Sequence, residues 1–415
     1  RSSGGAWPDP ASPVAMGETT RAPLPIRRSP AMHDDFAFTF GIEEEFFLAH
    51  PKSRSLATHV PASLLRACRR RFGDAVAPEL LRSQVELVSP VFDHHAQALE
   101  TMTRLRRGVA EIAIEKNLRL FAAGTPPIAA WGEQTETPKA RYRGLMDLFQ
   151  IVGRRNVLCG LHVHVAVPPG VDRVQLMNRV MPWLPAFLAL STSSPIWNRD
   201  PTGLMSYRQA AYDEWPRTGI PDHFRDEAEY ARFVELLAAG GAAKDASFLW
   251  WAIRPALRYP TLELRICDVC TRVQDAVAIA SLYRCLVSRM VRHPDAATAW
   301  TPFTRRLIDE NRWRAKRSGL EAEFLTLDGQ PPVACRTVVL ELLDDVAEDA
   351  ARLDCEPALA RIRRLLDEGT SAHVQIKLFE RRRAQGDTVT QAMQYVVDWL
   401  VAATYAGTDN GAVPP

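Results

Sequence analysis

Three consecutive glutamates, Glu43 to Glu45, interrupt the apolar run F-A-F-T-F-G-I-E-E-E-F-F-L near the start of the chain. The run alternates with a period of two, which predicts a strand over Phe38–Leu48. On that strand Glu43 and Glu45 share one face, about 7 Å apart at Cα. Glu44 falls on the apolar face and needs a buried partner, either an arginine or a backbone donor. Two carboxylates this close repel each other unless a cation separates them, so the pair indicates either a divalent metal site or a solvated strand face.

Imidazole and carboxylate groups recur on two further predicted strands. The segment Leu158–Val167 places His162 and His164 on one face, opposite a face of leucine and valine, where the pair could bind metal or phosphate. The segment Gln84–Val91 carries Glu86 inside another apolar run. Taken singly, a histidine or a glutamate in such a position is more often a satisfied core or surface residue than a ligand.

A third segment, Thr261–Ile266, adds Glu263 and Arg265 on the polar face of an alternating strand. Arg254 and Arg258 lie just upstream, and guanidinium groups bind phosphate and carboxylate through two parallel hydrogen bonds. The alternative is a cross-strand salt-bridge pattern on an exposed sheet. If these strands belong to one sheet, the acidic and imidazole groups could meet at one or two divalent metals, with the arginines supplying the positive charge that phosphoryl transfer requires.

The composition is ordinary for a soluble globular protein. The chain has 415 residues, 24% of them charged, and a formal net charge of +2, which gives no electrostatic case for binding nucleic acid or an acidic membrane. Its seven cysteines are scattered, which suits a reduced compartment such as the cytoplasm. Cys267 and Cys270 form a lone C-x-x-C with no second pair, so a zinc site is not expected. The longest apolar stretch, Met181–Trp197, is too short and too interrupted by proline to span a bilayer.

The order of elements predicts an α+β fold, because strands separated by long excursions are followed by a run of helices. We expect one domain over residues 36–405, with a sheet-bearing part (36–300) and a helical part (301–405). The proline-rich residues 1–35 are expected to be a disordered tail, and residues 406–415 a frayed one. Helices are predicted at 96–117, 174–190, 227–239, 275–291, 302–318, 333–353, 357–368, 372–385 and 389–403.

Several long motifs, taken together, resemble one protein family. They are G-I-E-E-E-F, S-Q-V-E-L-V-S-P, C-G-L-H-V-H-V, S-S-P-I-W-N-R-D-P-T-G, S-Y-R at 206–208, L-W-W-A-I-R-P-A-L-R-Y-P-T-L-E-L-R-I-C-D and E-N-R-W-R-A-K-R. In this order they resemble the carboxylate–amine ligase family, the YbdK-like, type 2 glutamate–cysteine ligase group, from about Phe36 to Ala403. The resemblance implies a glutamine-synthetase-like fold, in which a curved, mainly antiparallel sheet forms a funnel with helices on its outer face.

The resemblance also implies roles for matching residues. The implied catalytic residues are Arg265, which would stabilise the transferred phosphoryl group, and Glu263. The implied metal ligands are Glu43, Glu45, Glu86, His162 and Glu263. The implied ATP- or substrate-binding residues are His164, Arg208, Arg254, Arg258 and Arg314, of which the roles of Arg208 and Arg314 stay open, as does any role of Glu79. The implied cofactors are ATP and Mg²⁺, with Mn²⁺ as the alternative because an imidazole stands among oxygen ligands.

The implied reaction joins a carboxylate, typically the γ-carboxylate of glutamate, to an amine such as that of cysteine. The carboxylate attacks the γ-phosphorus of ATP to give an acyl phosphate and ADP, and the amine then attacks the carbonyl and expels phosphate. A shared fold can carry other activities, so two alternatives remain: a guanidino-kinase-like phosphotransferase and a non-catalytic nucleotide- or metal-binding regulator. The identity of the amine is open, and a homodimer is expected without support from any residue pattern.

Overall fold

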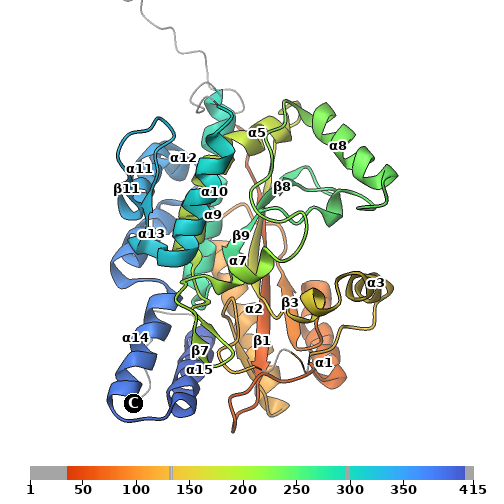
Figure 1. Cartoon of the computed structure of the whole chain (residues 1–415), viewed down its shortest axis with the longest axis vertical. Helices are drawn as coiled ribbons and strands as arrows, with labels where there is room; N and C mark the ends of the chain where they lie inside the picture. Colours follow the sequence, from red (N-terminus) through yellow and green to blue (C-terminus); the bar gives the residue numbers. More distant parts are fainter. Residues whose placement is uncertain (1–34, 130–131, 133, 295–299, 407–415) are drawn as a thin grey trace, which may run out of the picture.

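The computed structural model describes residues 35–129, 132, 134–294 and 300–406, and Figure 1 shows how their elements are arranged. Residues 1–34 and 407–415, which make up nearly all of the two predicted tails, lie outside the described residues. The rest of the chain alternates strands and helices up to β9 and is mainly helical after it. The expected α+β class is therefore confirmed.

A seven-stranded sheet runs through the centre of the molecule (Figure 1). The strands follow the order β2-β3-β1-β5-β9-β8, β4 also pairs with β1, and every pairing is antiparallel. The bounds are Phe40–Ala49 (β1), Val76–Pro78 (β2), Gln84–Val88 (β3), Arg119–Phe121 (β4), Gly160–Ala166 (β5), Ile253–Pro255 (β8) and Thr261–Asp268 (β9). The four strands described above and a fifth, predicted over Leu118–Ala123 and present as β4, all belong to this sheet, and β2 and β8 are additions at its two edges.

The register of the sheet places the chemistry-bearing residues in one band across it. Directly opposed pairs, from β3 to β8, are Glu86 with Glu45, Glu43 with His162, His164 with Glu263, and Glu263 with Arg254. Opposed residues of an antiparallel pair have Cβ atoms about 5 Å apart, so their side chains interact. A register shift between β5 and β9 gives β9 one extra residue near Arg265, as a β-bulge does.

Helices cover the opposite, apolar face of the sheet. Long helices α2 (His95–Glu115) and α9 (Val273–Arg292) pack against each other, and α9 also packs on β1 and β5. From β1, Phe40 and Ile42 are buried on this side, as the alternating pattern predicts. Glu44 is on the same side and fully buried, and the expected partner is confirmed as Arg106 of α2, whose Nε donates to Oε2 at 2.9 Å.

The C-terminal helices pack onto the sheet-bearing part. They are α10 (Thr304–Ser318), α11 (Cys335–Asp345), α12 (Ala347–Arg352), α13 (Glu356–Glu368), α14 (Ser371–Ala384) and α15 (Val389–Ala406). α10 packs on α6, α13 on α9 and α15 on β4, so the predicted helical part shares its core with the sheet. The helix predicted over 333–353 is wrong in detail, because it begins as strand β11 (Val333–Ala334), paired with β10 (Glu323–Phe324), and breaks at Val346 between α11 and α12.

Proline explains a second difference from the predicted helices. The single helix expected over 174–190 is divided into α5 (Arg173–Val180), a short 3-10 turn and α6 (Leu184–Ser191). Pro182 and Pro185 lie at this division, and each lacks the backbone N–H that a continuous helix needs. The helix predicted over 227–239 is present as α8 (Glu227–Ala239).

Several short elements were not predicted. They are α1 (Ala62–Phe72), α3 (Ala140–Phe149), α4 (Ile151–Arg154), α7 (Tyr207–Tyr212), β6 (Ile196–Trp197) and β7 (Asp200–Pro201).

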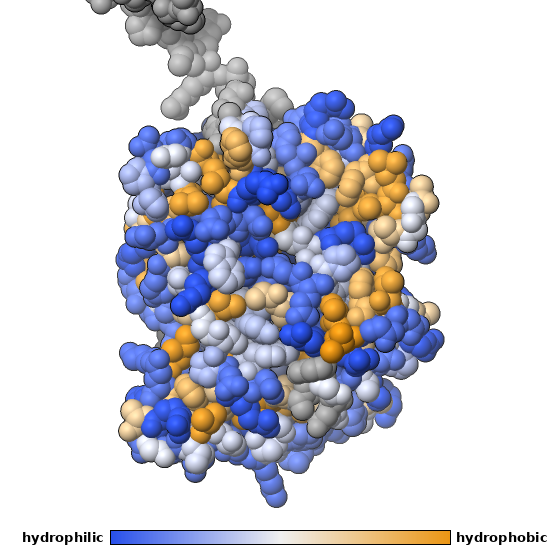
Figure 2. All heavy atoms as spheres, in the orientation of Figure 1, coloured by the Kyte–Doolittle hydropathy of each residue, from blue (hydrophilic) through white to orange (hydrophobic). Residues whose placement is uncertain are grey.

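The face of the molecule shown in Figure 2 is mainly hydrophilic, with hydrophobic side chains gathered toward α8, where Leu236 is exposed. Among the helices of the described residues, none is both long and apolar enough to cross a membrane.

Candidate active site

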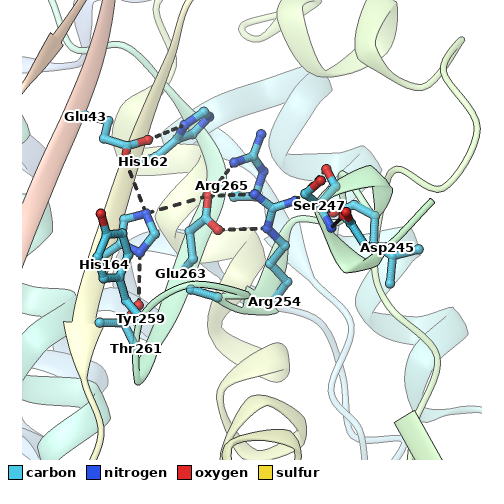
Figure 3. A network of polar contacts seen from close by, with 12 residues as sticks. Glu43, His162, His164, Asp245, Ser247, Arg254, Tyr259, Thr261, Glu263 and Arg265 are labelled. Atoms are coloured by element: carbon cyan, nitrogen blue, oxygen red, sulfur yellow. Dashed lines mark hydrogen bonds and ion pairs between the residues drawn. The ribbon is translucent and has the colours of Figure 1, made fainter. Parts of the chain in front are cut away.

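Three side chains from adjacent strands form a candidate cation site (Figure 3). One ligand atom from each of Glu43, His162 and Glu263 lies within 4.8 Å of the other two. The residues belong to β1, β5 and β9, and the antiparallel register holds them together. Two carboxylates and one imidazole suit Mg²⁺ or Mn²⁺. The donor set therefore fits the divalent cation that the sequence predicts here.

The protonation states of this trio favour cation binding. Burial raises the pKa of Glu43, but hydrogen bonding and charge from His162 and His164 outweigh it and hold the pKa far below its usual range. Nδ1 of His162 and Nε2 of His164 each lie 3.6 Å from a Glu43 oxygen. Burial, helped by the charge of Arg265, lowers the pKa of His162 to about 4. An ionised carboxylate and a neutral imidazole are the forms that coordinate metal.

Two arginines hold the third member of the trio (Figure 3). Nε of Arg254 donates to Oε2 of Glu263 at 2.7 Å, and Nη1 of Arg265 donates to the other oxygen, Oε1. Burial raises the pKa of Glu263, but the charges of Arg265 and Arg254 outweigh it and hold the pKa well below its usual range. Arg254 is fixed further by a 2.8 Å bond to the carbonyl of Leu249. Both guanidiniums are thus oriented beside the trio before any substrate arrives.

A cluster of three further carboxylates lies beside the Glu43–His162–Glu263 trio. Glu45, Glu79 and Glu86 line the same cavity, and the sequence left the role of Glu79 open. Burial, together with the charge of Glu79, raises the pKa of Glu45 to about 7, and burial with three neighbouring carboxylates raises the pKa of Glu86 well above its usual range. Crowded carboxylates of this kind are ionised together only when a cation neutralises them. Among the described residues, however, only the Glu43–His162–Glu263 trio already has its ligand atoms within 4.8 Å of one another.

The site consists of two cavities that share part of their lining. We call the smaller one, with a volume of about 280 Å³, the inner cavity, and the larger one, with a volume of about 890 Å³, the outer cavity. Glu45, Glu79 and Arg208 line the inner cavity, whereas His164 and Arg258 line the outer one. The residues that line both are Glu43, Glu86, Arg141, Leu145, Ser247, Arg254 and Arg265. A small polar chamber and a larger one therefore meet beside the acidic groups and the paired arginines.

The structure brings together all but one of the residues singled out in the sequence. Arg208 is buried in the wall of the inner cavity, and Arg258 is exposed in the turn between β8 and β9. Arg314 is placed elsewhere: on α10 it pairs with Glu310 at 3.1 Å and does not occur among the described residues that line the two cavities. Arg314 is half-buried and also donates to the carbonyl of Glu323 at 3.0 Å, and its binding role stays a prediction.

Several cavity residues were not found from the sequence. Arg141 of α3 lies between the two cavities, its Nη2 donates to the carbonyl of Ser247 at 3.4 Å, and its guanidinium stacks on Phe248. Aromatic residues add to the inner wall: Tyr142, Tyr212, Trp215 and Trp250. Their signal in the sequence is weak, because α3, the short helix α7 and the loops that carry them show neither strand alternation nor a strong helical period.

Gly160 is a position where an added side chain would displace residues of the site. Its backbone N–H donates to Oε2 of Glu45 at 2.7 Å. A Cβ placed there would lie 2.3 Å from Nη2 of Arg208 and 3.2 Å from Nε2 of His162. The absence of a side chain therefore lets the buried guanidinium of Arg208 and the imidazole of His162 come close to the first residue of β5.

Gly160→Ala is therefore expected to lower enzymatic turnover by about 10- to 100-fold, because small displacements of positioned groups are costly. Overpacking is expected to lower the free energy of unfolding by about 1–3 kcal/mol. Steady-state kinetics and urea unfolding would measure both effects. Gly41→Ala is the matched control, because a Cβ on that β1 glycine would meet only Ser89 Oγ, at 3.8 Å. Equal activity of the two variants would contradict this reading of Gly160.

A solved ligase shares this fold. The structure of a glutamate–cysteine ligase from Francisella tularensis in complex with AMP superposes with a TM-score of 0.65 at 13% identity, covering 91% of this chain and 90% of that chain. At this level of identity the likeness shows a common fold. It agrees with the fold that the sequence motifs imply.

Relatives at higher identity show the family. A protein from Ectopseudomonas mendocina (strain ymp) is 45% identical over 366 residues, which cover 88% of this chain and 97% of that protein. One from Rhodospirillum rubrum is 44% identical over 385 residues, which cover 91% and 99%. Both carry the name "Putative glutamate--cysteine ligase 2".

These similarities place the chain in the class of ATP-dependent carboxylate–amine ligases. Residues 39–394 match the glutamate-cysteine ligase family 2 (GCS2), and the chain belongs to that family. The resemblance drawn from the strand motifs is confirmed. The family match also covers every residue placed at the site above.

Proposed function

We propose that this protein uses ATP to activate the γ-carboxylate of glutamate and joins it to an amine, in the manner of a glutamate–cysteine ligase. One observation carries the proposal: a cation-binding trio and two arginines clamped to Glu263 stand where a large cavity meets a small one. A nucleotide in the outer cavity and an amino acid in the inner cavity would bring their reacting groups to this junction. Phosphoryl transfer depends chiefly on such positioning and on charge stabilisation.

The nucleotide is assigned to the outer cavity by size and charge. This cavity is about three times the volume of the inner one, at 890 Å³ against 280 Å³. Arg258 and Lys244 line it, and both can bind phosphate oxygens. His164 lines the same cavity beside Glu263. Its Nδ1 forms a hydrogen bond of 3.0 Å with Thr261 Oγ1. The triphosphate would thus point toward the trio.

The proposed metal ligands around the junction are the trio Glu43, His162 and Glu263 and, beside it, the carboxylates of Glu45, Glu79 and Glu86. Divalent cations bound there, Mg²⁺ or Mn²⁺, would neutralise phosphate charge and hold oxygen atoms for transfer. The protein itself supplies Arg265 and Arg254, whose orientation is set by Glu263. Their remaining N–H groups would stabilise charge on the transferred phosphoryl group.

The proposed reaction has two steps, phosphoryl transfer and amide formation. A γ-carboxylate oxygen of glutamate forms a bond to the γ-phosphorus, the bond to the β-phosphate oxygen breaks, and ADP leaves. The amine nitrogen next bonds to the carbonyl carbon, inorganic phosphate leaves, and the nitrogen loses a proton. The names of the relatives make cysteine the first amine to test. None of the seven cysteines, all within the described residues, lines either cavity, so the only thiol in the reaction would be the substrate's.

ADP release is expected to require ATP, a divalent cation, glutamate and an acceptor amine together. The acyl phosphate would otherwise remain bound, so adding the amine is expected to raise the rate at least about tenfold. A coupled ADP assay over a panel of amino acids and amines would measure this, with mass spectrometry to identify the γ-glutamyl amide. A phosphorylated product without an amide would point instead to a phosphotransferase. Nucleotide binding without turnover would support a regulator.

The cytoplasmic location and the homodimer stay predictions.

A further inference from the structure

Asp268, the last residue of β9, joins three segments that are far apart in the sequence. Its side chain is completely buried. Its Oδ2 accepts hydrogen bonds from the backbone N–H of Ser193 at 3.0 Å and from Ser194 Oγ at 2.7 Å. Its Oδ1 accepts a hydrogen bond from Ser206 Oγ at 2.8 Å. Because hydrogen bonds to a charged acceptor are among the strongest in proteins, this carboxylate fixes both serine segments relative to the sheet.

These four residues belong to motifs that the proposed reaction leaves without a role. Ser193 and Ser194 open the motif S-S-P-I-W-N-R-D-P-T-G, and Ser206 opens S-Y-R. Asp268 closes the long motif that ends in L-E-L-R-I-C-D. The hydrogen bonds of Asp268 therefore connect three of the segments by which the sequence resembles its family.

The network holds the start of α7, a helix that contributes two side chains to the inner cavity. Ser206 is the N-cap of α7, and Ser194 Oγ accepts a hydrogen bond from the backbone N–H of Arg208 at 3.0 Å. Arg208 and Tyr212 line the inner cavity, with the guanidinium carbon 5.4 Å from the ring centre of the tyrosine. Asp268 is not among the described residues that line either cavity. Its influence on the cavity must therefore pass through α7.

Asp268 also supplies negative charge near the guanidinium of Arg208. That guanidinium passes close to Gly160, the residue that lies opposite Asp268 in the register of β5 and β9. Burial raises the pKa of Asp268, and the charge of Arg208 is the largest of the effects that lower it. A buried guanidinium is costly unless a carboxylate compensates its charge. The carboxylate of Asp268 therefore stabilises Arg208 in the cavity wall.

We propose that Asp268 is a positioning residue for the inner cavity, an assignment that rests on the proposed function. Its hydrogen bonds hold the start of α7, and its charge compensates that of Arg208. Together they keep Arg208 and Tyr212 in place. Loss of Asp268 is then expected to weaken the binding of the amino acid in the inner cavity and to spare the nucleotide in the outer one.

Three variants separate the charge of Asp268 from its hydrogen bonds. In Asp268→Asn the amide oxygen can still accept and the amide NH2 can donate to Ser206 Oγ, so mainly the charge is lost. The KM for glutamate is expected to rise about tenfold in Asp268→Asn and about 100-fold in Asp268→Ala, which loses the hydrogen bonds as well. Ser206→Ala keeps the charge but removes the helix cap, and an increase of about threefold to tenfold is expected. The KM for ATP should stay within about threefold in all three variants. Steady-state kinetics with Mg²⁺ and cysteine as the amine would measure these constants.

Asp275→Asn is the matched control for a loss of stability alone. Asp275 is also a buried aspartate, it pairs with Arg361 at 2.6 Å, and it is not among the described residues that line either cavity. This variant is expected to unfold at a lower urea concentration and to keep both KM values. An unchanged KM for glutamate in Asp268→Ala, or an equal rise in the KM for glutamate and for ATP, would overturn the proposal.

Amide hydrogen exchange separates this proposal from the proposed function, because it needs no turnover. The backbone amides of α7 are expected to exchange at least about tenfold faster in Asp268→Ala and Ser206→Ala than in the unaltered protein, since local opening follows the loss of local contacts. Unchanged exchange in α7 would overturn the positioning role. An unaltered protein that forms no amide with any amine, while α7 loosens in the variants, would refute the ligase proposal alone. If Asp268→Ala fails to fold, Ser206→Ala with unchanged exchange and an unchanged KM for glutamate would overturn the assignment.

Discussion

Glu43→Gln is expected to reduce ATP turnover by about a thousandfold or more while the protein stays folded. Glu43 contributes a carboxylate to the candidate cation trio and lines both cavities, so the substitution removes a charge from the junction itself. Charge stabilisation at the reacting centre is commonly the largest catalytic term, and about a thousandfold corresponds to about 4 kcal/mol in the barrier. The neutral amide is also a poorer ligand for a hard cation.

The effect of Glu43→Gln on stability is expected to be small. The Glu43 side chain is 28% exposed, and its ion-pair partners are His162 and His164, both at 3.6 Å, so the free energy of unfolding should change by less than about 1 kcal/mol. ADP release over a Mg²⁺ titration, together with thermal unfolding, would measure both. A cation-binding role predicts a weaker apparent Mg²⁺ affinity as well as a slower rate.

A second glutamate provides the control for this substitution. Glu111→Gln alters an exposed pair with Arg71, 2.8 Å long, and Glu111 does not line either cavity, so this variant should keep full activity. Unchanged turnover and unchanged Mg²⁺ dependence in Glu43→Gln would remove Glu43 from the cation site. Lost activity in the control would point to a non-specific effect of charge.

Arg106→Leu is expected to lower the free energy of unfolding by about 3–5 kcal/mol. Arg106 and Glu44 are both almost completely buried, and the arginine also donates to the carbonyls of Cys270 and Thr271, at 2.9 Å each. Removing the guanidinium leaves a carboxylate and two carbonyls without their donors in the core. Equilibrium unfolding in urea would measure the loss, with activity followed in parallel.

Two further variants separate charge burial from packing in this test. Arg71→Leu breaks the exposed pair with Glu111 and should change the free energy of unfolding by at most about 1 kcal/mol. Adding Glu44→Leu to Arg106→Leu should restore part of the lost stability, because the uncompensated charge is gone. A loss below about 1 kcal/mol for Arg106→Leu alone would show that Glu44 does not depend on its arginine.

Strand periodicity was the most reliable signal in the sequence. It predicted that Ile42, Val163 and Leu264 face the core, and all three are buried. It also predicted that Glu43 and Glu45 share a face and that Glu44 needs a buried partner. These predictions held because successive side chains on a strand point to opposite sides whatever the strand packs against.

Signals that depend on helix packing and loop position were weaker. Arg314 belongs to a motif that resembles the family, but α10 buries Ile308, Arg312 and Ala315 and leaves Arg314 in contact with solvent. Arg141 lies on α3, whose pattern predicts no element. The side of a helix that faces a site is set by what the helix packs on, and that surface comes from distant parts of the chain.

By itself, the sequence determined the strands, the composition of their faces and, through its motifs, the family. Those features are local or are carried in the order of residues. Only the tertiary structure decided that Arg106, 62 positions away, pairs with Glu44, and that Glu79 joins Glu45 and Glu86. It alone showed that Arg208 is buried and lines the inner cavity. Contacts between remote residues arise from packing and sheet register, and a single sequence does not state which register or which packing will form.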